Sequence, residues 1–190
     1  MHADKWALKA KQSGYKTRAV YKLEEILTKT RSLNTSHKIL DIGSAPGGWS
    51  HYLKLKLPNS EIYALDILEM DEIPGVSFFQ NSIENIDEIP EINELKDKFN
   101  LVISDIAPNI TGINAVDTEN IYKLNFLTLK AAHRYTEKTN GKFIIKTFQN
   151  SMFKGLRKEM EKLFNIVQTF KPAASKKQSA EIYLYGAKKK

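Results

Sequence analysis

The stretch KILDIGSAPGGWS, from Lys38 to Ser50, decides the fold of this chain. Its first residues form an apolar run around Leu40, which is typical of a short buried strand. Glycines then let the backbone turn sharply and approach a ligand closely: Gly43, Gly47 and Gly48. Pro46 suits the first turn of a helix, because the N–H that proline lacks has no partner there. We therefore expect a strand, a turn and a helix, the arrangement at which doubly wound α/β folds bind nucleotide-like ligands.

The spacing of the glycines and a later acid indicate the class of ligand. The fingerprint G-x-G-x-x-G, which binds a pyrophosphate at a helix N-terminus, is not met here. Ile62 to Asp66 resembles a second strand that ends in an acid. An acid about 20 residues beyond the turn suits the hydroxyls of a ribose. A ligand with a ribose and no pyrophosphate points to S-adenosyl-L-methionine; the alternative is an ordinary turn with an unrelated surface carboxylate at Asp66.

Length and composition set the class of protein. A chain of 190 residues is expected to form one domain, and without cysteine it forms neither disulfides nor thiolate metal sites. No run approaches the roughly 18 apolar residues of a membrane helix. The histidines show no ligand spacing, so we expect no metal. Without a signal-peptide core we expect a cytoplasmic protein, or a mitochondrial or other organellar one if an upstream transit peptide has been removed.

The net charge of +7 is concentrated at the two ends of the chain. Residues 1–38 carry nine Lys or Arg against three Asp or Glu, and residues 171–190 carry six against one. The middle of the chain is acidic. Basic ends suggest that the termini hold an anionic polymer. The alternative is a pair of solvated tails, which is how we interpret Lys188 to Lys190.

Alternating strand and helix patterns continue to the end of the chain. They predict helices over 15–30, 117–135 and 153–163, a loop and helix over 83–98, and strands over 76–79, 99–105, 142–146, 164–170 and 181–186. The fold class is therefore α/β, a Rossmann-like fold with seven strands in a single domain. Within it we expect a basic N-terminal helix region over 1–37, an α/β core over 38–187 and a tail over 188–190.

Two charged residues are expected at strand ends. Asp105 closes a continuous apolar run, and a carboxylate at the tip of a central strand lies at the ligand crevice. The alternative, that it caps a helix, is disfavoured by Pro108. Lys146 ends the next strand, where burying an ammonium is costly. The alternative for this lysine is that it reaches out to solvent.

Five segments together resemble the FtsJ/RrmJ-type ribose 2′-O-methyltransferases. In chain order they are Tyr15 to Ile26, Asp41 to Trp49, Ser104 to Asn109, Ile145 to Gln149 and Ser175 to Tyr183. The resemblance implies the Rossmann-like, seven-stranded methyltransferase fold, S-adenosyl-L-methionine as cofactor and a ribose 2′-hydroxyl in structured RNA as substrate. The turn is closer to the large-subunit ribosomal RNA branch than to the tRNA branch, with uridine as the expected nucleotide. One departure is Asn81, where family members usually have Asp; an amide still accepts a hydrogen bond from adenine.

The resemblance also implies a set of site residues. The catalytic Lys-Asp-Lys-Glu tetrad of the family falls on Lys22, Asp105, Lys146 and Glu181. The expected cofactor site comprises Asp41, Gly43, Ala45, Pro46, Gly47, Gly48, Trp49, Asp66, Asn81 and Asp105. The expected RNA contacts are Lys16, Arg18, Lys22, Lys176 and Lys177. Because a hydroxyl must lose its proton at or before attack, we expect Lys146 to act as the base, with the two carboxylates holding the two amines in place.

Other functions remain open on the sequence. We expect a monomer, with the basic ends free for RNA. The alternatives are a tRNA ribose methyltransferase and a non-catalytic RNA-binding factor of ribosome assembly, which the intact tetrad disfavours. A Rossmann dehydrogenase is disfavoured by the glycine spacing, and a small-molecule O-methyltransferase would not need basic ends.

Overall fold

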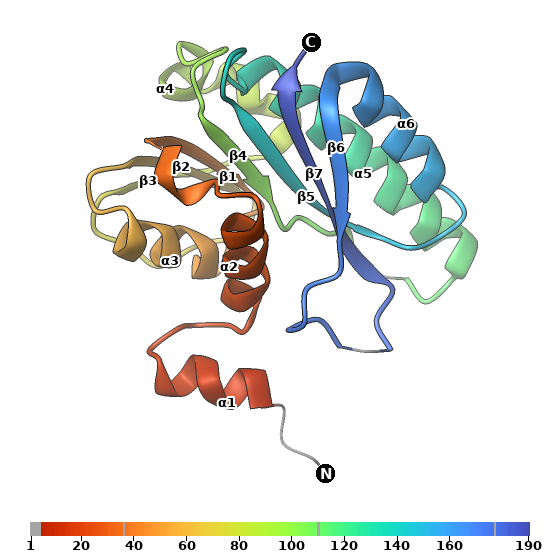
Figure 1. The fold of residues 1–190 in the computed structure, drawn as a ribbon, viewed down its shortest axis with the longest axis horizontal. Coiled ribbons are helices and arrows are strands. Elements are labelled where there is room, and N and C mark those ends of the chain that lie inside the picture. Colours follow the sequence, from red (N-terminus) through yellow and green to blue (C-terminus); the bar gives the residue numbers. More distant parts are fainter. Residues whose placement is uncertain (1–4, 36, 110, 177) are drawn as a thin grey trace.

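The computed structural model describes residues 5–35, 37–109, 111–176 and 178–190. One seven-stranded sheet has the order β3-β2-β1-β4-β5-β7-β6 (Figure 1). Its strands are β1 (Lys38–Ile42), β2 (Glu61–Asp66), β3 (Val76–Gln80), β4 (Leu101–Ser104), β5 (Lys142–Phe148), β6 (Phe164–Phe170) and β7 (Glu181–Lys189). Strands β1 to β5 pair in parallel, and β7 pairs antiparallel with both β5 and β6. The expected α/β class and the seven strands are confirmed.

Helices cover both faces of this sheet (Figure 1). They are α1 (Lys5–Gln12), α2 (Ala19–Lys29), α3 (Gly48–Lys56), α4 (Pro90–Asn93), α5 (Asn114–Tyr135) and α6 (Phe153–Leu163), with short 3-10 helices at Leu33–Thr35 and Ile83–Glu88. Successive strand residues point to opposite faces, so Ile39 packs with α2 and α3, whereas Leu40 and Ile42 pack with α5 and α6. Within the described residues, no helix has both the length and the apolar character needed to cross a membrane.

The glycine turn has the expected order of strand, turn and helix, but Pro46 does not lie in the first turn of α3. That helix begins at Gly48 and has Gly47 as its N-cap, in a left-handed conformation with φ of 94°. A Cβ at Gly47 would lie 2.7 Å from the Cδ1 of Ile73. The backbone angle and the close packing at position 47 therefore require glycine. Pro46 lies before the helix and not in its first turn.

Several predicted starts of helices are wrong, because contacts outside each segment decide where its helix begins. Helix α1 was not expected; it packs through Trp6 and Ala10 on Tyr21 of α2. Helix α2 begins at Ala19 and not at residue 15. Helix α5 begins at Asn114, because Asp117 accepts hydrogen bonds from the backbone N–H groups of residues 111 and 112 and so ties the preceding loop to the first turn.

Strands β5 and β7 are also longer than expected. Pairing between β5 and β7 continues to Phe148 opposite Glu181, so Lys146 lies two residues inside its strand and not at the tip. The expected tail over 188–190 is wrong as well, because β7 runs to Lys189. The ammonium of Lys189 forms an ion pair with Asp97 and donates to the carbonyl of Thr136 at 3.1 Å, which fixes the end of the chain against the core.

Candidate active site

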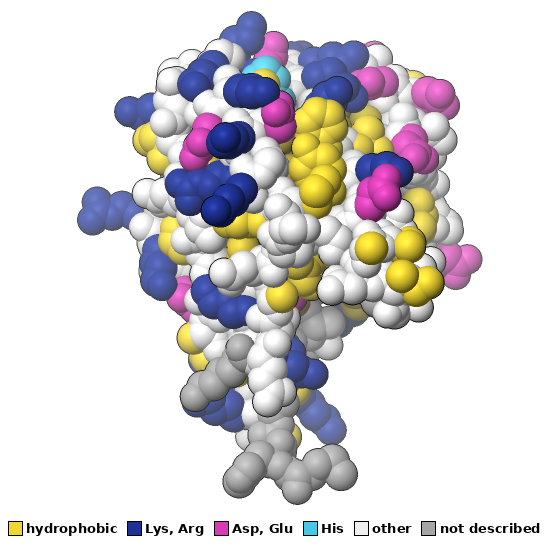
Figure 2. Space-filling view, turned by 90° about the vertical axis from the view of Figure 1, so that its right-hand side faces the viewer, with side chains coloured by type: hydrophobic (Ala, Val, Ile, Leu, Met, Phe, Trp, Pro, Cys, Tyr) yellow, Lys and Arg dark blue, Asp and Glu magenta, His cyan; other side chains and the backbone are white. Residues whose placement is uncertain are grey.

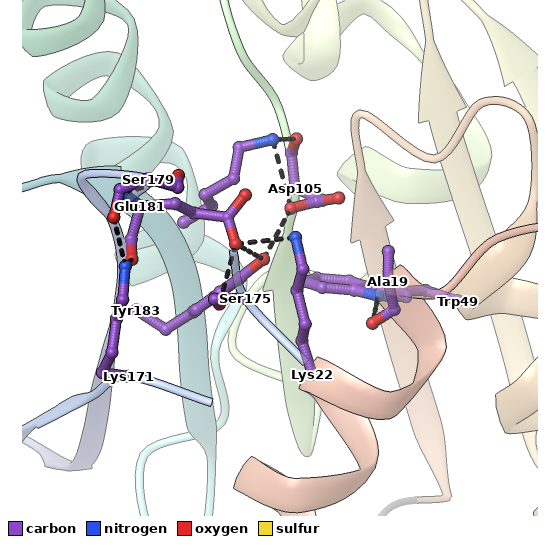
Figure 3. Close-up of polar contacts among 10 residues, drawn as sticks. Ala19, Lys22, Trp49, Asp105, Lys171, Ser175, Ser179, Glu181 and Tyr183 are labelled. Atoms are coloured by element: carbon purple, nitrogen blue, oxygen red, sulfur yellow. Dashed lines mark hydrogen bonds and ion pairs between the residues drawn. The ribbon is translucent and has the colours of Figure 1, made fainter. Parts of the chain in front are cut away.

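Two ion pairs form at the ends of the central strands. Lys22 Nζ of α2 lies 2.6 Å from Glu181 Oε1 at the start of β7. Lys146 Nζ of β5 lies 3.1 Å from Asp105 Oδ1, directly after β4, and also donates to the Asp105 carbonyl oxygen. Figure 3 shows Lys22, Asp105 and Glu181 pointing toward one another from three different elements. The structure thus brings together all four residues of the predicted tetrad.

Strand register explains why these residues meet. Ser104 pairs with Ile145, so the following Asp105 lies beside Lys146. Lys146 in turn pairs with Tyr183 on β7, and Glu181 shares a face with Tyr183 because side chains alternate along a strand. Helix α2 covers that face and supplies Lys22. The pairing of neighbouring strands therefore fixes the positions of Asp105, Lys146 and Glu181.

Tyr183 links the two ion pairs, and it was not among the predicted site residues. Its hydroxyl lies 3.2 Å from Asp105 Oδ1 and 3.4 Å from Glu181 Oε1, so it can donate to either carboxylate. The side chain is fully buried, with its ring 6.1 Å from that of Trp49. Burial and the two negative charges hold the pKa of Tyr183 well above its ordinary value, which keeps the hydroxyl a donor. The alternation of side chains along the strand places Tyr183 on the same face as Glu181, but it does not indicate the contact with Asp105.

The carboxylate of Glu181 is held in its charged form. Burial raises its pKa, but the hydrogen bond and charge of Lys22, the hydrogen bond from Ser175 and the charge of Lys146 lower it more, so the net pKa lies below the ordinary value. The hydroxyl of Ser175 donates at 3.1 Å. Lys171 fixes the backbone at the same place by donating to the Glu181 carbonyl oxygen at 2.6 Å (Figure 3). The ionised form of Glu181 is therefore favoured beside Lys22.

The glycine turn lines a narrow cavity next to the tetrad. Its walls include Asp41, Gly43, Ser44, Ala45, Pro46, Gly48, Trp49 and Asp105. Asp41 Oδ2 accepts from the hydroxyl of Ser50 at 2.6 Å. Asp41 Oδ1 and Ser44 Oγ are buried without a hydrogen-bond partner in the part of the chain that the structure describes. Because buried polar atoms are normally paired, this cavity is suited to a ligand that brings its own polar or cationic groups.

Asp66 and Asn81 lie together at the outer end of this site. Asp66 Oδ2 accepts from the N–H of Ala45 at 2.8 Å, and its Oδ1 accepts from the N–H of Leu68 at 2.9 Å. These bonds tie the glycine turn to the end of β2. The N–H of Asn81 donates to the Asp66 carbonyl at 2.9 Å, while its side-chain oxygen accepts from Ser82 and Asn85. Contacts of these two residues with a cofactor stay predictions.

The Asp41 carboxyl makes a testable contribution to stability. Burial raises its pKa to about 7, and the negative charges of Asp105 and Asp66 add to the rise, although the hydrogen bond from Ser50 opposes it. Between pH 4 and 7 the unfolded chain is ionised here and the folded chain is not. We therefore expect the free energy of unfolding to fall as the pH rises through this window, by at most about 1.4 kcal/mol per pH unit from this group, and to level off above it.

Urea unfolding of the ligand-free protein at several pH values checks this expectation. Asp41→Asn should remove the fall, whereas Glu88→Gln at an exposed position should follow the wild-type curve. If Asp41→Asn and wild type lose stability in parallel between pH 4 and 7, the raised pKa is wrong.

Two of the five predicted RNA contacts share a groove, and the others do not. Arg18 and Lys176 line a groove between α1 and the β6–β7 loop, together with Lys5, Lys171 and Trp6. Lys16 is ion-paired with the exposed Asp71 at 2.7 Å. Lys22 is 7 % exposed and belongs to the tetrad, which makes it a poor phosphate contact. Lys177 lies outside the described residues. For the described ranges, no group of three or more His, Cys, Asp or Glu could hold a metal ion.

Comparisons with known proteins point to one family. Residues 15–189 match the family of FtsJ-like methyltransferases. The chain is 39% identical over 186 residues to the ribosomal RNA large subunit methyltransferase E of Chromobacterium violaceum, covering 96% of this chain and 90% of that protein. It is 37% identical to the protein of the same name from Wigglesworthia glossinidia brevipalpis, with the same coverage.

Solved structures agree with the fold. A crystal structure described as a ribosomal RNA methyltransferase of Plasmodium falciparum superimposes with a TM-score of 0.79 at 29% identity, covering 91% of this chain and 97% of that one. Human methyltransferase-like protein 13, solved with SAH, superimposes with a TM-score of 0.59 over 83% of this chain and 74% of that one. At 12% identity the second likeness concerns the fold alone.

Proposed function

Because the chain belongs to the FtsJ-like methyltransferase family, we propose that it transfers a methyl group from S-adenosyl-L-methionine to a ribose 2′-hydroxyl of large-subunit ribosomal RNA. We expect uridine as the methylated nucleotide. The observation that supports this most is the pair of linked ion pairs, Lys22 with Glu181 and Lys146 with Asp105, beside a cavity lined with unpartnered polar atoms. The relatives that cover nearly the whole chain carry the name ribosomal RNA large subunit methyltransferase E.

The residues around the glycine turn fit the proposed cofactor. Asp41 Oδ1 and Ser44 Oγ offer buried acceptors to an ammonium, and Asp66 stands at the end of β2, where ribose hydroxyls are bound in related folds. Gly43 allows the close approach of Ile106, because a Cβ there would lie 2.7 Å from that side chain. When bound, S-adenosyl-L-methionine supplies an electrophilic methyl group on a sulfonium and leaves as a neutral thioether. Trp49 and Pro46 would complete the wall of the site.

Lys146 is the proposed base. In its neutral form it takes the proton of the 2′-hydroxyl as the oxygen attacks, which makes a weak nucleophile competent. The carbonyl and carboxylate of Asp105 already hold its nitrogen, so they stabilise the ammonium that forms. Lys22, held by Glu181, is placed to orient the ribose. Alignment of oxygen, methyl and sulfur is worth about 7–11 kcal/mol in well-oriented reactions.

Basic side chains near the start of α2 are proposed to contact RNA phosphates. Charge reversal of Lys16 and Arg18 together should weaken RNA binding and lower the slope of log Kd against log salt by about 0.7–0.9 for each phosphate that is no longer neutralised. The measurement is a salt titration of binding to naked large-subunit RNA. As a matched control, reversal of Lys96 and Lys98, two exposed residues that precede β4, should leave the slope closer to that of wild type. An unchanged slope in the Lys16 and Arg18 variant would place the RNA elsewhere.

Transfer of labelled methyl tests the proposed function directly. Large ribosomal subunits, naked ribosomal RNA and bulk tRNA are offered side by side, with Lys146→Ala as the inactive control. We expect label in the large subunit or its RNA, mapped to a ribose 2′-oxygen. Label only in tRNA would overturn the substrate, and bound RNA without cofactor binding or transfer would favour a non-catalytic assembly factor. We expect a monomer in the cytoplasm, or in an organelle if an upstream transit peptide has been removed.

A further inference from the structure

A second pocket lies between the first turns of α5 and the segment that precedes α6. It is lined by Asn114, Ala115, Thr118, Glu119, Tyr122 and Lys123 of α5 and by Ser151 and Met152 before α6, and we name it the α5 pocket. Its volume is about 750 Å³. That size falls within the range of small-molecule sites, and it is large enough for a nucleobase.

Each wall of the α5 pocket is connected along the chain to a strand that carries or precedes a tetrad residue: β4 precedes Asp105, and β5 carries Lys146. The loop that begins at Asp105 leads into the first turn of α5, and the chain that follows Lys146 and the end of β5 leads to Ser151. The loop is fastened at its far end, because Asp117 accepts from the N–H groups of Thr111 and Gly112 at 2.8 and 3.0 Å. A molecule bound in the pocket would therefore be held at a defined place relative to the two catalytic side chains.

The lining of the α5 pocket suits an uncharged, flat group. The ring of Tyr122 is stacked with that of Phe126 at 6.0 Å and 13°, and Gly155 of α6 lies close behind it. Ala115 and Met152 add apolar surface. The two charges cancel, because Lys123 Nζ lies 2.6 Å from Glu119 Oε1.

The α5 pocket also has polar side chains that could form hydrogen bonds with a base. The side chains of Asn114, Thr118 and Ser151 offer hydrogen-bond donors and acceptors of the kind that read base edges. Beside the pocket, Ile113 is 61% exposed and Val116 is 40% exposed. Figure 2 shows hydrophobic patches and clusters of Lys and Arg next to one another on one face of the molecule. A phosphate is better served by those clusters, and a base is better served by the α5 pocket.

We propose that the α5 pocket binds a nucleobase of the RNA that neighbours the methylated nucleotide, and that this contact sets which ribose reaches Lys146. The inference rests on the proposed function and adds a base-reading site to it. The argument is the continuity of the pocket with Asp105 and Lys146 and the neutral, aromatic lining. The phosphates would meanwhile contact the basic groove that includes Arg18 and Lys176.

Two substitutions test the α5 pocket without touching the tetrad. Tyr122→Ala removes the ring, and Tyr122→Phe keeps it as the matched control. Ala115→Leu fills the pocket from an exposed position, where it cannot disturb the core, and Ala115→Ser is its control. We measure the Kd for naked large-subunit RNA in the absence of cofactor, KM for RNA, kcat and cofactor affinity.

Tyr122→Ala and Ala115→Leu are each expected to raise the RNA Kd and KM about tenfold, within the range measured for loss of one stacked base. Cofactor affinity should not change, and both controls should stay within about twofold. Unchanged Kd and KM in both variants of an active enzyme would overturn the inference and leave the proposed function standing. If the wild type transfers no methyl but its RNA Kd depends on Tyr122, the proposed function is overturned and the base-binding pocket stands. Effects with intact subunits but not with naked RNA would assign the pocket to a ribosomal protein and overturn the base-binding proposal.

Discussion

Lys146→Ala is expected to lower kcat for methyl transfer by about 10²–10⁴-fold, the usual contribution of a general base. The side chain lies at 3.1 Å from Asp105 Oδ1 and is 11% exposed, so water does not readily replace it. Cofactor affinity should stay within a few fold, because Lys146 is not among the residues that line the glycine-turn cavity. The measurement is single-turnover transfer of labelled methyl with saturating cofactor and RNA.

Lys142→Ala provides the matched control for Lys146. Lys142 lies four residues earlier on β5, on the same face of the strand, at the end far from the site. Its loss should leave kcat near that of wild type. Substantial transfer by Lys146→Ala would remove the base assignment, and an equal loss in Lys142→Ala would indicate damage to the strand and not to the chemistry.

Asp105→Asn is expected to lower kcat by about 10²–10³-fold, comparable to the loss of one preorganised electrostatic partner. The amide keeps the shape of the carboxyl but removes the charge that balances Lys146 once it is protonated. The hydroxyl of Tyr183 would also lose one of its two charged acceptors. Because Asp105 also lines the glycine-turn cavity, cofactor affinity should fall as well. Transfer is therefore measured at saturating cofactor, and cofactor binding is measured separately.

Two controls separate the charge of Asp105 from its packing. Glu91→Gln removes an exposed carboxylate on α4 and should leave kcat unchanged. Tyr183→Phe keeps the ring in the core and removes only the bridging hydroxyl, so it should cost less than Asp105→Asn. If Asp105→Asn retains wild-type kcat at saturating cofactor, the carboxylate does not stabilise the protonated lysine.

Much of the fold follows from local pattern. The strand before Gly43, the helix after Gly47, helix α6 and strand β6 are where the sequence predicts them. These elements are short, strongly patterned and bounded by glycine or by a change of period, so local residues suffice. Predicted ends failed where a distant partner extends an element, as for β5 opposite β7 and for the last residues of β7 beside Asp97.

The tetrad residues of the candidate site could be predicted from the sequence, but their contacts could not. Asp105 was expected at a strand end from its apolar run, and the four tetrad positions followed from a family resemblance. Their pairing, however, depends on register: Lys146 faces Tyr183, and Ser104 faces Ile145. Tyr183 itself lies in an ordinary apolar strand, and nothing local marks its hydroxyl as a bridge between Asp105 and Glu181.

The sequence by itself determined the α/β class, the glycine turn, the chemical types at the site and the basic ends, because periodicity, glycine and charge act locally along the chain. Only the tertiary structure decided which lysine pairs with which carboxylate, that Tyr183 joins the pairs, that Lys189 is anchored, and that a neutral pocket opens between α5 and α6. Those features arise between strands and helices far apart in sequence. Their geometry is set by strand register and close packing, which no single segment encodes.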